Sequence, residues 1–466
     1  MIFLASSERR SLQPILLIWI FSATKRIDRN YNGEAMIRRL LLLILFCAPL
    51  AHAQDKVTVD FSSDQGAVTY RASGFLNGMN STVPLARLVN PIKMKFYRGL
   101  AANADEPNTY TRILAQGAIP EYILSDAWEY TFVSCYTPGG PNVCPGDGGN
   151  WRSWDNFVTS TVSGLYSSGQ TALQYDIWNE PDITNFWPRS EAQYQTMWRH
   201  AVTAIRAINP SIQIVGPSTC CNRGGDGWGA WAMNLLAFAK TNSVLPNILS
   251  FHEINTVNST AQFITDVANA KSYLATHDPG ITKIEVNEMI SKTDDYSPGM
   301  NIQFLAVAGR SHLWAAAKTC AVAGECDNLS LDGLLKSDSV TTRAIWYAYQ
   351  AYANISGRLV NVTPTSNVDG IAGQDSTLHQ AYSVFGRNNT SDTINITYSN
   401  INSSASYLGS TIHVNGFLLA NDNGGGSSGP SQVINANYSV SSNQIVVTYP
   451  KVPANDVVIV QLTRAR

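Results

Sequence analysis

The chain has 466 residues, of which 44% are apolar and only 14% are charged, and its formal net charge is −2. This apolar fraction is that of a folded protein, and the length exceeds what one ordinary domain needs, so we expect a large domain and a smaller one. A charge so close to zero gives no reason to expect nucleic acid or an anionic membrane surface as a partner.

A secretory signal peptide is predicted at residues 36–53 rather than at the first methionine. Residues 36–39 form a basic start, a short apolar core follows, and residues 51–53, Ala-His-Ala, form a small-residue cleavage site. The apolar core is too short to span a bilayer. We therefore expect a secreted or periplasmic protein whose mature chain begins at Gln54. Residues 1–35 would then be a non-native upstream extension, the alternative being an unusual leader.

The cysteines fall in a pattern that predicts local disulfides. One of the seven, Cys47, lies in the predicted signal peptide, and the other six form the close pairs Cys135 with Cys144, Cys220 with Cys221, and Cys320 with Cys326. In an exported protein, close pairs in even number are typical of a disulfide framework, although a ring between the neighbours 220 and 221 would be strained. No cysteine or histidine spacing matches a zinc site, so we predict no metal and no cofactor.

Residues 71–358 alternate short apolar runs with amphipathic ones, a pattern typical of βα units and a parallel sheet. The clearest helix covers residues 190–208, where Ser190 and Gln193 form a capping box. Seven or eight βα units in about 290 residues predict a (β/α)8 TIM barrel rather than an open sheet. The predicted strands are residues 74–77, 94–98, 120–124, 173–178, 212–217, 248–252, 283–288 and, less well defined, 328–331.

From residue 359 to residue 466 the hydrophobic period changes to two. Runs such as Ile394/Ile396/Tyr398 alternate with polar residues and are separated by turns rich in Asn, Gly and Ser. This pattern indicates a C-terminal antiparallel β-sandwich. Residues 54–70 alternate in the same way ahead of the barrel, so we expect this N-terminal strand to return and pair with the sandwich.

Two glutamates stand at the ends of predicted barrel strands. Glu180 follows an apolar run and precedes Pro181, and Glu288 ends the run 283–288. Active sites in these barrels lie at the C-terminal ends of the strands. Retaining glycoside hydrolysis needs one carboxylic acid to protonate the departing oxygen and one carboxylate to attack the anomeric carbon. We interpret Glu180 as the acid/base and Glu288 as the nucleophile.

Each glutamate has an alternative interpretation. Glu180 could be an exposed turn residue, and Glu285 could be the nucleophile in place of Glu288. Strand alternation places residues 285 and 288 on opposite faces, and residue 288 lies nearer the strand end, which favours Glu288.

Five further side chains are candidates for the substrate pocket. Asn179 is placed to bond a sugar 2-hydroxyl, and Arg98 could keep Glu288 ionised or form a structural ion pair. His252 is either a pocket residue or a satisfied buried histidine. Trp128 and Trp178 are candidate sugar contacts, although Trp128, like Trp228 elsewhere, could equally pack a loop.

Residues 178–187, with the sequence WNEPDITNFW, closely resemble the acid/base segment of glycoside hydrolase family 39. The similarity is strongest over residues 170–220 and returns at residues 250–252 and 286–288. It implies a barrel with an appended sandwich and retaining hydrolysis, most often of β-xylosides. The family also contains iduronidases and enzymes that act on bacterial exopolysaccharides.

Position by position, the resemblance implies that Glu180 is the acid/base, Glu288 the nucleophile, Asn179 the 2-hydroxyl contact and His252 a pocket histidine. Two departures concern the substrate. Ile254 stands where relatives usually carry a tyrosine, and no aromatic platform is recognisable around the eighth strand.

These observations predict an exported, metal-independent retaining β-glycosidase that acts on an oligosaccharide or polysaccharide, with an exo-acting, β-xylosidase-like enzyme as the first hypothesis. One alternative is an endo-acting hydrolase of a secreted polysaccharide. Another is a β-glucuronidase, which would need a cation for the sugar carboxylate. From a different class, the alternative is a carbohydrate-binding protein without turnover.

Overall fold

The computed structural model describes residues 54–465 except 101–104, 132–134, 136–143, 221–227, 255–259, 321–325 and 327–328. The predicted signal peptide, the upstream extension and Cys221 lie outside the described residues. Residues 54–466 form one compact unit. Within the described ranges, no helix has both the length and the apolar character needed to cross a membrane.

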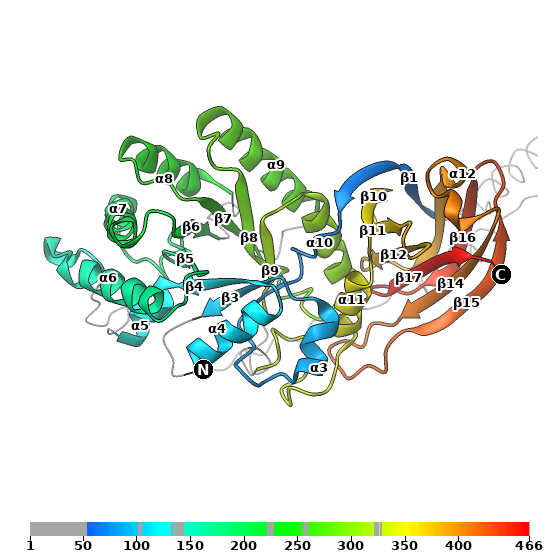
Figure 1. Ribbon diagram of the computed structural model, residues 1–466, viewed down its shortest axis with the longest axis horizontal. Helices are drawn as coiled ribbons and strands as arrows, with labels where there is room; N and C mark the ends of the chain where they lie inside the picture. Colours follow the sequence, from blue (N-terminus) through cyan, green and yellow to red (C-terminus); the bar gives the residue numbers. More distant parts are fainter. Residues whose placement is uncertain are drawn as a thin grey trace, which may run out of the picture. The chain divides into compact units, whose positions relative to one another are not determined.

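Eight parallel strands close into a barrel (Figure 1). Pairing runs in chain order and closes where Gly74 of the first strand pairs with Ala317 of the last. This confirms the predicted (β/α)8 barrel. The strands are β2 (Gly74–Leu76), β3 (Phe96–Leu100), β4 (Ile119–Ile123), β5 (Gln174–Asp176), β6 (Gln213–Thr219), β7 (Ile248–Glu253), β8 (Lys283–Met289) and β9 (Ala315–Lys318).

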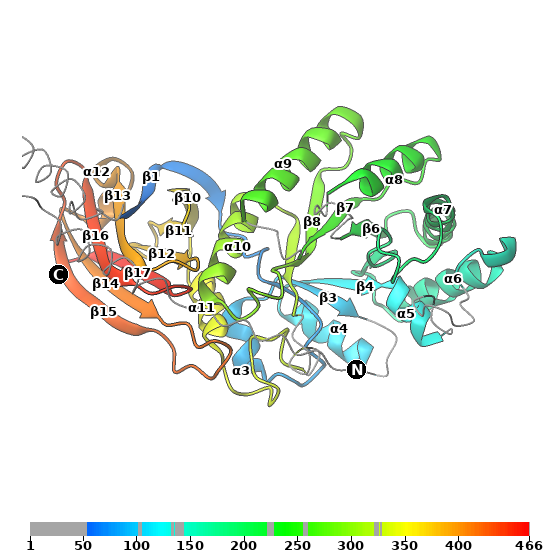
Figure 2. The same ribbon diagram turned by 180° about the vertical axis from the view of Figure 1, so that it is seen from behind.

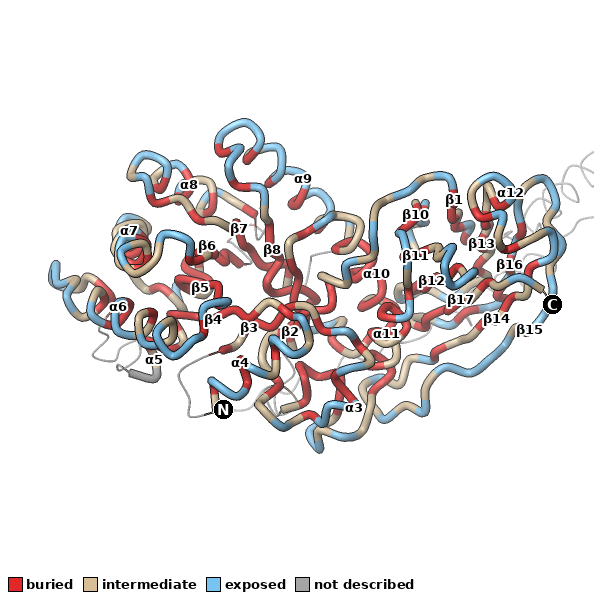
Figure 3. The backbone as a smooth tube through the Cα atoms, viewed as in Figure 1, coloured by how far each residue is buried: buried red, intermediate tan, exposed pale blue. Residues whose placement is uncertain are grey.

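Helices cover the outside of the barrel, and their outer faces are exposed while the strands are buried (Figure 3). The longer ones are α4 (Glu106–Ala115), α5 (Leu124–Thr131), α6 (Arg152–Ser167), α7 (Glu191–Ile208), α8 (Ala230–Thr241), α9 (Thr260–His277), α10 (Pro298–Arg310) and α11 (Ala344–Ala353). The short α3 (Ala86–Val89) follows β2.

The predicted cap is confirmed at Ser190, whose side chain accepts a hydrogen bond from the Gln193 backbone amide at 3.2 Å at the start of α7. The Gln193 side chain, which a capping box would direct back to Ser190, donates to the Pro145 carbonyl at 2.9 Å and to Asp147 Oδ1 at 3.1 Å. The buried face of α7 includes Trp198, which packs against β6. A Cβ atom at Gly216, where φ is +154°, would lie 2.4 Å from the Trp198 ring. Only glycine therefore allows this close approach of helix and strand.

The eighth strand is where the sequence prediction was wrong. The structure places it at β9, Ala315–Lys318, and not at residues 328–331. Ala315 to Ala317 have no β-branched side chain, so their composition favours a helix. They form a strand because small side chains fit against the buried Phe96 ring of β3 in the barrel. Of the predicted segment, residue 328 is outside the described residues and Leu331 lies in a loop, with its amide bonded to the Gly78 carbonyl.

The C-terminal part is a mixed nine-stranded sheet with the order β15-β14-β17-β12-β11-β10-β1-β13-β16. Tyr449 of β16 donates a hydrogen bond to the Ile459 carbonyl of β17 at 3.0 Å, so one end of the sheet folds over its middle as a sandwich. The strands are β1 (Asp55–Ala67), β10 (Arg358–Thr363), β11 (Val368–Asp375), β12 (Gln380–Arg387), β13 (Asp392–Ser399), β14 (Thr411–Leu419), β15 (Ser431–Ser439), β16 (Gln444–Val452) and β17 (Val457–Arg464). Helix α12 (Ile401–Ser404) follows β13.

The N-terminal strand returns to the sandwich as predicted. β1 pairs with β10 in antiparallel orientation and with β13 in parallel orientation. Its inward residues Val57, Val59 and Phe61 are buried in the sandwich core. Among the described strand pairs of this sheet, only β1–β13 is parallel and departs from the antiparallel sheet expected, because a distant segment is inserted between two strands.

Helix α10 joins barrel and sandwich, and both views show it between the barrel strands and the sandwich strands β11 and β12 (Figure 1, Figure 2). Two glycines allow this contact. The Gly299 amide donates to the Asn455 carbonyl at 2.8 Å, and a Cβ atom at Gly386 would lie only 1.9 Å from the Gly299 carbonyl oxygen. The barrel and the sandwich therefore meet backbone to backbone.

Replacing Gly386 by alanine is expected to lower the free energy of unfolding by about 1–3 kcal/mol, because the two backbones must separate. Equilibrium unfolding in urea would measure the change. The control is Gly164→Ala in α6, where an added Cβ has no neighbour within 4 Å. That change should stabilise the protein by about 0.5–1 kcal/mol through helix propensity. Equal effects of the two substitutions would contradict the interpretation of the contact.

Candidate active site

The C-terminal ends of four barrel strands bring Arg98, Glu180, His252 and Glu288 together. Arg98 is on β3, His252 on β7 and Glu288 on β8, while Glu180 lies four residues beyond the end of β5. All four side chains are buried, with relative exposures of 7% or less. These residues were selected from the sequence, and the barrel brings them to one end, as strand-end residues require.

Arg98 is the centre of the arrangement. Its Nη1 is 2.5 Å from Glu288 Oε1, its Nη2 is 2.7 Å from both Asp176 Oδ2 and Asn179 Oδ1, and its Nε is 3.1 Å from Glu121 Oε1. Burial alone would lower the pKa of Arg98, but the carboxylates of Asp176, Glu288 and Glu121 raise it above its ordinary value. The guanidinium is thus a permanent positive charge beneath the carboxylates.

Glu180 is held by its backbone and by His252. Its φ of +45° is in the left-handed region, uncommon for a residue with a side chain, and its amide donates to the Ser218 carbonyl at 3.0 Å. Oε1 of Glu180 is 3.0 Å from His252 Nδ1. Burial raises the pKa of Glu180 to about 7, with the Arg98 charge opposing the rise. This carboxyl group therefore carries its proton over much of the range up to neutrality.

Glu288 has a different environment. Its Oε1 receives the hydrogen bond from Arg98, and its Oε2 is 3.7 Å from His252 Nδ1. Burial raises the pKa of Glu288, and His252 and Arg98 oppose this rise. A charge-assisted hydrogen bond from a guanidinium favours the ionised carboxylate.

Glu285, the alternative to Glu288, lies inside the barrel. Its Oε1 accepts a hydrogen bond from Gln174 Nε2 at 2.6 Å, and it is also bonded to Glu121. Burial, with the neighbouring Glu121 carboxyl group, raises the pKa of Glu285 well above its ordinary value. Glu285 does not line the cavity described below.

A shift of register in β8 brings Glu288 to the rim. Phe251 of β7 pairs with Val286, but the next residue, His252, pairs with Glu288, so residue 287 is skipped in the ladder. Asn287 instead points into the barrel and donates to Ser218 Oγ at 3.0 Å. Because residues 285 and 287 point into the barrel, simple alternation would turn residue 288 away from the barrel axis, and the register shift is what brings the Glu288 carboxylate to the cavity.

The carboxylates face a cavity of about 570 Å³ at this end of the barrel. It is lined by Leu76, Asn77, Arg98, Ile123, Asp126, Glu129, Asn179, Glu180, Phe186, Ile254 and Glu288. The lining includes Ile254, the residue that stands in place of the usual tyrosine, and one aromatic ring, Phe186. The volume is that of a small-molecule site.

His252 lies beside the two glutamates and is fully buried. It is not among the residues that line the cavity. Burial lowers the pKa of His252 to about 4, so the imidazole is neutral at neutral pH. A neutral ring can accept a hydrogen bond from protonated Glu180 through Nδ1 or, as the other tautomer, donate one to the ionised carboxylate.

Trp128 and Trp178 do not lie against the cavity, in contrast to the expectation from the sequence. They belong to a buried aromatic cluster in which Trp154 is 5.4 Å from Trp128 and 5.8 Å from Trp178, measured between ring centroids. The Trp178 Nε1 donates to the Phe186 carbonyl at 3.2 Å. Large rings next to the motif are therefore used to pack the loop behind the site, and Phe186 lines the cavity in their place.

Several site residues were missed in the sequence. Asp126 and Glu129 line the cavity from α5, Asn77 lines it after β2, and Asp176 and Glu121 bind Arg98 from beneath. Two of these carried a signal, because a charged residue inside an apolar strand needs a partner. Asp176 and Glu121 both occupy such positions and share the Arg98 cation.

Two predicted disulfides are confirmed, Cys135–Cys144 and Cys320–Cys326. Cys220 is also disulfide-bonded, but its predicted partner, Cys221, is outside the described residues. Glu180, Cys220 and His252 bring ligand-type atoms within 4.8 Å of one another. A sulfur atom in a disulfide is not a thiolate, so this group lacks the cysteine ligand that a metal ion would need.

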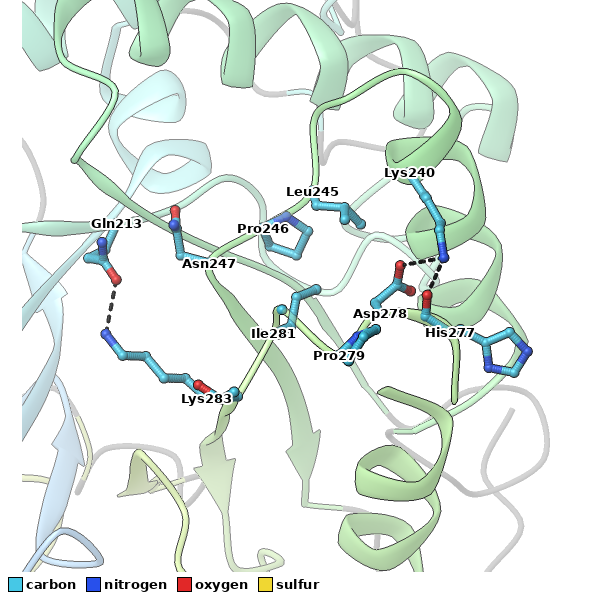
Figure 4. A pocket seen from close by; sticks show the side chains of 12 residues that line it. Gln213, Lys240, Leu245, Pro246, Asn247, His277, Asp278, Pro279, Ile281 and Lys283 are labelled. Atoms are coloured by element: carbon cyan, nitrogen blue, oxygen red, sulfur yellow. Dashed lines mark hydrogen bonds and ion pairs between the residues drawn. The ribbon is translucent and has the colours of Figure 1, made fainter. Parts of the chain in front are cut away.

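A second cavity of about 570 Å³ lies at the opposite end of the strands, where β6 and β8 begin. Lys283 and Gln213 are bonded across one side of it at 3.0 Å, and Lys240 and Asp278 pair at 3.4 Å on the other (Figure 4). The cations are thus paired with their neighbours. Residues at the N-terminal face of such barrels serve stability rather than catalysis.

Comparisons with known proteins agree with this geometry. Residues 149–298 match the model of the glycosyl hydrolases family 39. A segment of 112 residues is 26% identical to a beta-xylosidase of Caldicellulosiruptor saccharolyticus, and it covers 23% of this chain and 22% of that protein. The family match includes Glu180, His252 and Glu288.

Solved structures share the fold over most of the chain. The structure of N2152 from Neocallimastix frontalis has a TM-score of 0.75 at 24% identity and covers 88% of this chain and 100% of that one. A monomeric beta-xylosidase from Caulobacter crescentus CB15 has a TM-score of 0.62 at 15% identity, with 89% of this chain and 100% of that one covered. Residues 149–298 are thus similar in sequence to the glycosyl hydrolases family 39, and the barrel with its sandwich is a fold that these solved structures share over most of the chain.

Proposed function

We propose that the protein is a retaining β-glycosidase with Glu180 as acid/base and Glu288 as nucleophile. The observation that carries the proposal is the pair of glutamates in one cavity, with Glu288 bonded to Arg98 and both facing His252 Nδ1. Because each glutamate has an oxygen near this one nitrogen, those two oxygens lie within about 7 Å of each other. Such proximity suits retaining enzymes, whose carboxyl groups are about 5–5.5 Å apart.

In the first step, Oε2 of Glu288 attacks the anomeric carbon, since Oε1 is occupied by Arg98. The bond from that carbon to the glycosidic oxygen breaks, and the Glu180 proton passes to the departing oxygen. In the second step, ionised Glu180 takes a proton from water, the hydroxide oxygen bonds to the anomeric carbon, and Glu288 leaves as a carboxylate. Glu180 ends each cycle protonated again.

Asn179 is suited to bind the 2-hydroxyl group of the sugar. Its Oδ1 accepts a hydrogen bond from Arg98 at 2.7 Å, which orients the amide so that Nδ2 remains as a donor. A hydrogen bond to the 2-hydroxyl strengthens as the transition state forms. Arg98 therefore positions both Glu288 and Asn179.

A β-xyloside is the first candidate substrate, because the relatives named above include two beta-xylosidases. We further propose that the protein is exported through the signal peptide at residues 36–53, which the disulfides support. An exo-acting enzyme should release monosaccharide from oligosaccharides. Release of longer products would favour the endo-acting alternative.

The test is release of aryl alcohol from a panel of aryl α- and β-glycosides by the purified protein. Turnover of β-xyloside that is lost in Glu288→Ala would support the proposal. Hydrolysis restricted to α-glycosides would overturn the β assignment. Binding of xylo-oligosaccharides without turnover of any aryl glycoside or polysaccharide would favour the carbohydrate-binding alternative.

The pH dependence should reflect the proton on Glu180. The first step needs this group protonated, so kcat/KM should be retained below its pKa of about 7 and fall as pH rises through that value. The measurement is the pH profile of kcat/KM on a β-xyloside with a poor leaving group. For the Glu180→Gln variant, the pH profile of kcat/KM on a substrate with a good leaving group should lack this fall at alkaline pH. A fall that persists there would assign it to another residue.

A further inference from the structure

We propose that Asp126 and Glu129 select uncharged sugars, by accepting hydrogen bonds from sugar hydroxyl groups and by excluding the carboxylate of uronic acids. This inference rests on the proposed glycosidase function and adds the class of sugar. It concerns the part of the cavity that α5 forms, next to the two glutamates.

The first observation is the orientation of α5. Asp126 and Glu129 are three residues apart, which places them on one face of the helix, and both line the same cavity as Glu180 and Glu288. Between them, Ala127 and Trp128 are fully buried. The helix therefore presents its two carboxyl groups to the cavity and its apolar residues to the core.

The second observation is the balance of charge. Among the described lining residues, four carry carboxyl groups (Asp126, Glu129, Glu180 and Glu288) and one, Arg98, is cationic. Arg98 is 1% exposed. Its hydrogen bonds go to Asp176, Asn179 and Glu288.

A second described cation at a strand end is also bonded to its neighbours. Lys318, at the end of β9, is fully buried. Its Nζ is 3.4 Å from Asp295 Oδ1 and donates to the Thr319 carbonyl at 2.6 Å. Neither Arg98 nor Lys318 is therefore available to bind the carboxylate of a sugar acid.

The chemistry follows from this imbalance. Ionised carboxylates accept strong hydrogen bonds from hydroxyl groups, so the α5 pair suits a neutral sugar rich in hydroxyls. A uronate would place a like charge in a confined site whose described lining residues offer no cation free of a carboxylate partner, which disfavours binding. Burial raises the pKa of Asp126 to about 6, with Arg98 opposing the rise, so this group remains ionised at pH 7.5.

The test compares two ligands that differ only in charge. Phenyl 1-thio-β-glucuronide and its uncharged 6-amide resist hydrolysis, so calorimetric titration at pH 7.5 measures binding whether or not the protein turns over a substrate. The proteins are the wild type, Asp126→Asn, Glu129→Gln and the double variant. The control is Glu191→Gln, which removes a carboxylate at the start of α7, outside the cavity lining.

Wild type and Glu191→Gln should bind the amide at least about 100-fold more tightly than the uronate. The double variant should reduce this ratio about tenfold or more. It should also lower kcat/KM on β-xyloside roughly tenfold for each hydrogen bond lost. Near-equal affinity of the wild type for both ligands, or an unchanged ratio in the double variant, would overturn the inference.

The same experiment separates this inference from the proposed function. Selective binding of the amide with no turnover of any glycoside would support selection by charge and would contradict the proposed glycosidase activity. Turnover of β-xyloside with equal binding of amide and uronate would support the glycosidase activity and would contradict selection by charge.

Discussion

Replacing Glu288 by alanine is expected to lower kcat on an aryl β-xyloside by roughly 10⁴-fold or more, because the variant lacks the carboxylate that forms the glycosyl-enzyme bond. The fold should persist, since the side chain lies at the rim of the cavity and not in the packed barrel interior. The measurement is the steady-state rate, with circular dichroism as the check on folding.

The matched control is Glu285→Gln, three residues earlier on the same strand. Glutamine has the shape of the protonated side chain, and it can still accept the hydrogen bond from Gln174 and donate one to Glu121. We expect kcat within about tenfold of wild type for this variant. A wild-type rate in Glu288→Ala together with loss of activity in Glu285→Gln would reverse the assignment.

Replacing Arg98 by methionine should be the most destabilising of these substitutions, by about 3–5 kcal/mol, because it leaves buried carboxylates without their cation. Glu121 and Asp176 are both fully buried and lie 3.1 and 2.7 Å from the guanidinium. Activity should fall as well, since Asn179 and Glu288 lose the group that orients them. The free energy of unfolding in urea measures the first effect.

The control for Arg98→Met is Arg358→Met, which breaks the pair between Arg358 and Asp64. Those two side chains are 57% and 47% exposed, so the cost should be small compared with the loss at Arg98. A loss at Arg98 no larger than that at Arg358 would show that the carboxylates beneath it do not depend on its charge.

The barrel, the sandwich and the glutamate pair were predictable because they leave local patterns. Strand-length apolar runs gave seven of the eight barrel strands, and the Ser190 cap marks the start of α7. The return of β1 to the sandwich followed from its period of two. Glu180 and Glu288 could be predicted because each stands at the end of an apolar run of strand length.

Other features depend on contacts between residues distant in the chain, so they cannot be predicted from the local sequence. Three alanines form β9 only because the buried Phe96 ring leaves room for small side chains. The place of Trp128 and Trp178 behind the site depends on Trp154, which is brought near by α6. In both cases tertiary packing, and not the local helix propensity or the neighbouring sequence motif, determines where the residues lie.

The sequence by itself determined the order of the βα units, the sandwich and the two glutamates, because hydrophobic period and strand-end position are local properties. Only the tertiary structure determined the burial, the hydrogen-bond partners and therefore the pKa of each of those glutamates. Burial of Glu180, the skipped residue before Glu288 and the convergence of Asp176 and Glu121 on Arg98 all arise when the barrel closes. The electrostatics of the site therefore belong to the closed barrel, since desolvation and charge pairing exist only once distant strands meet.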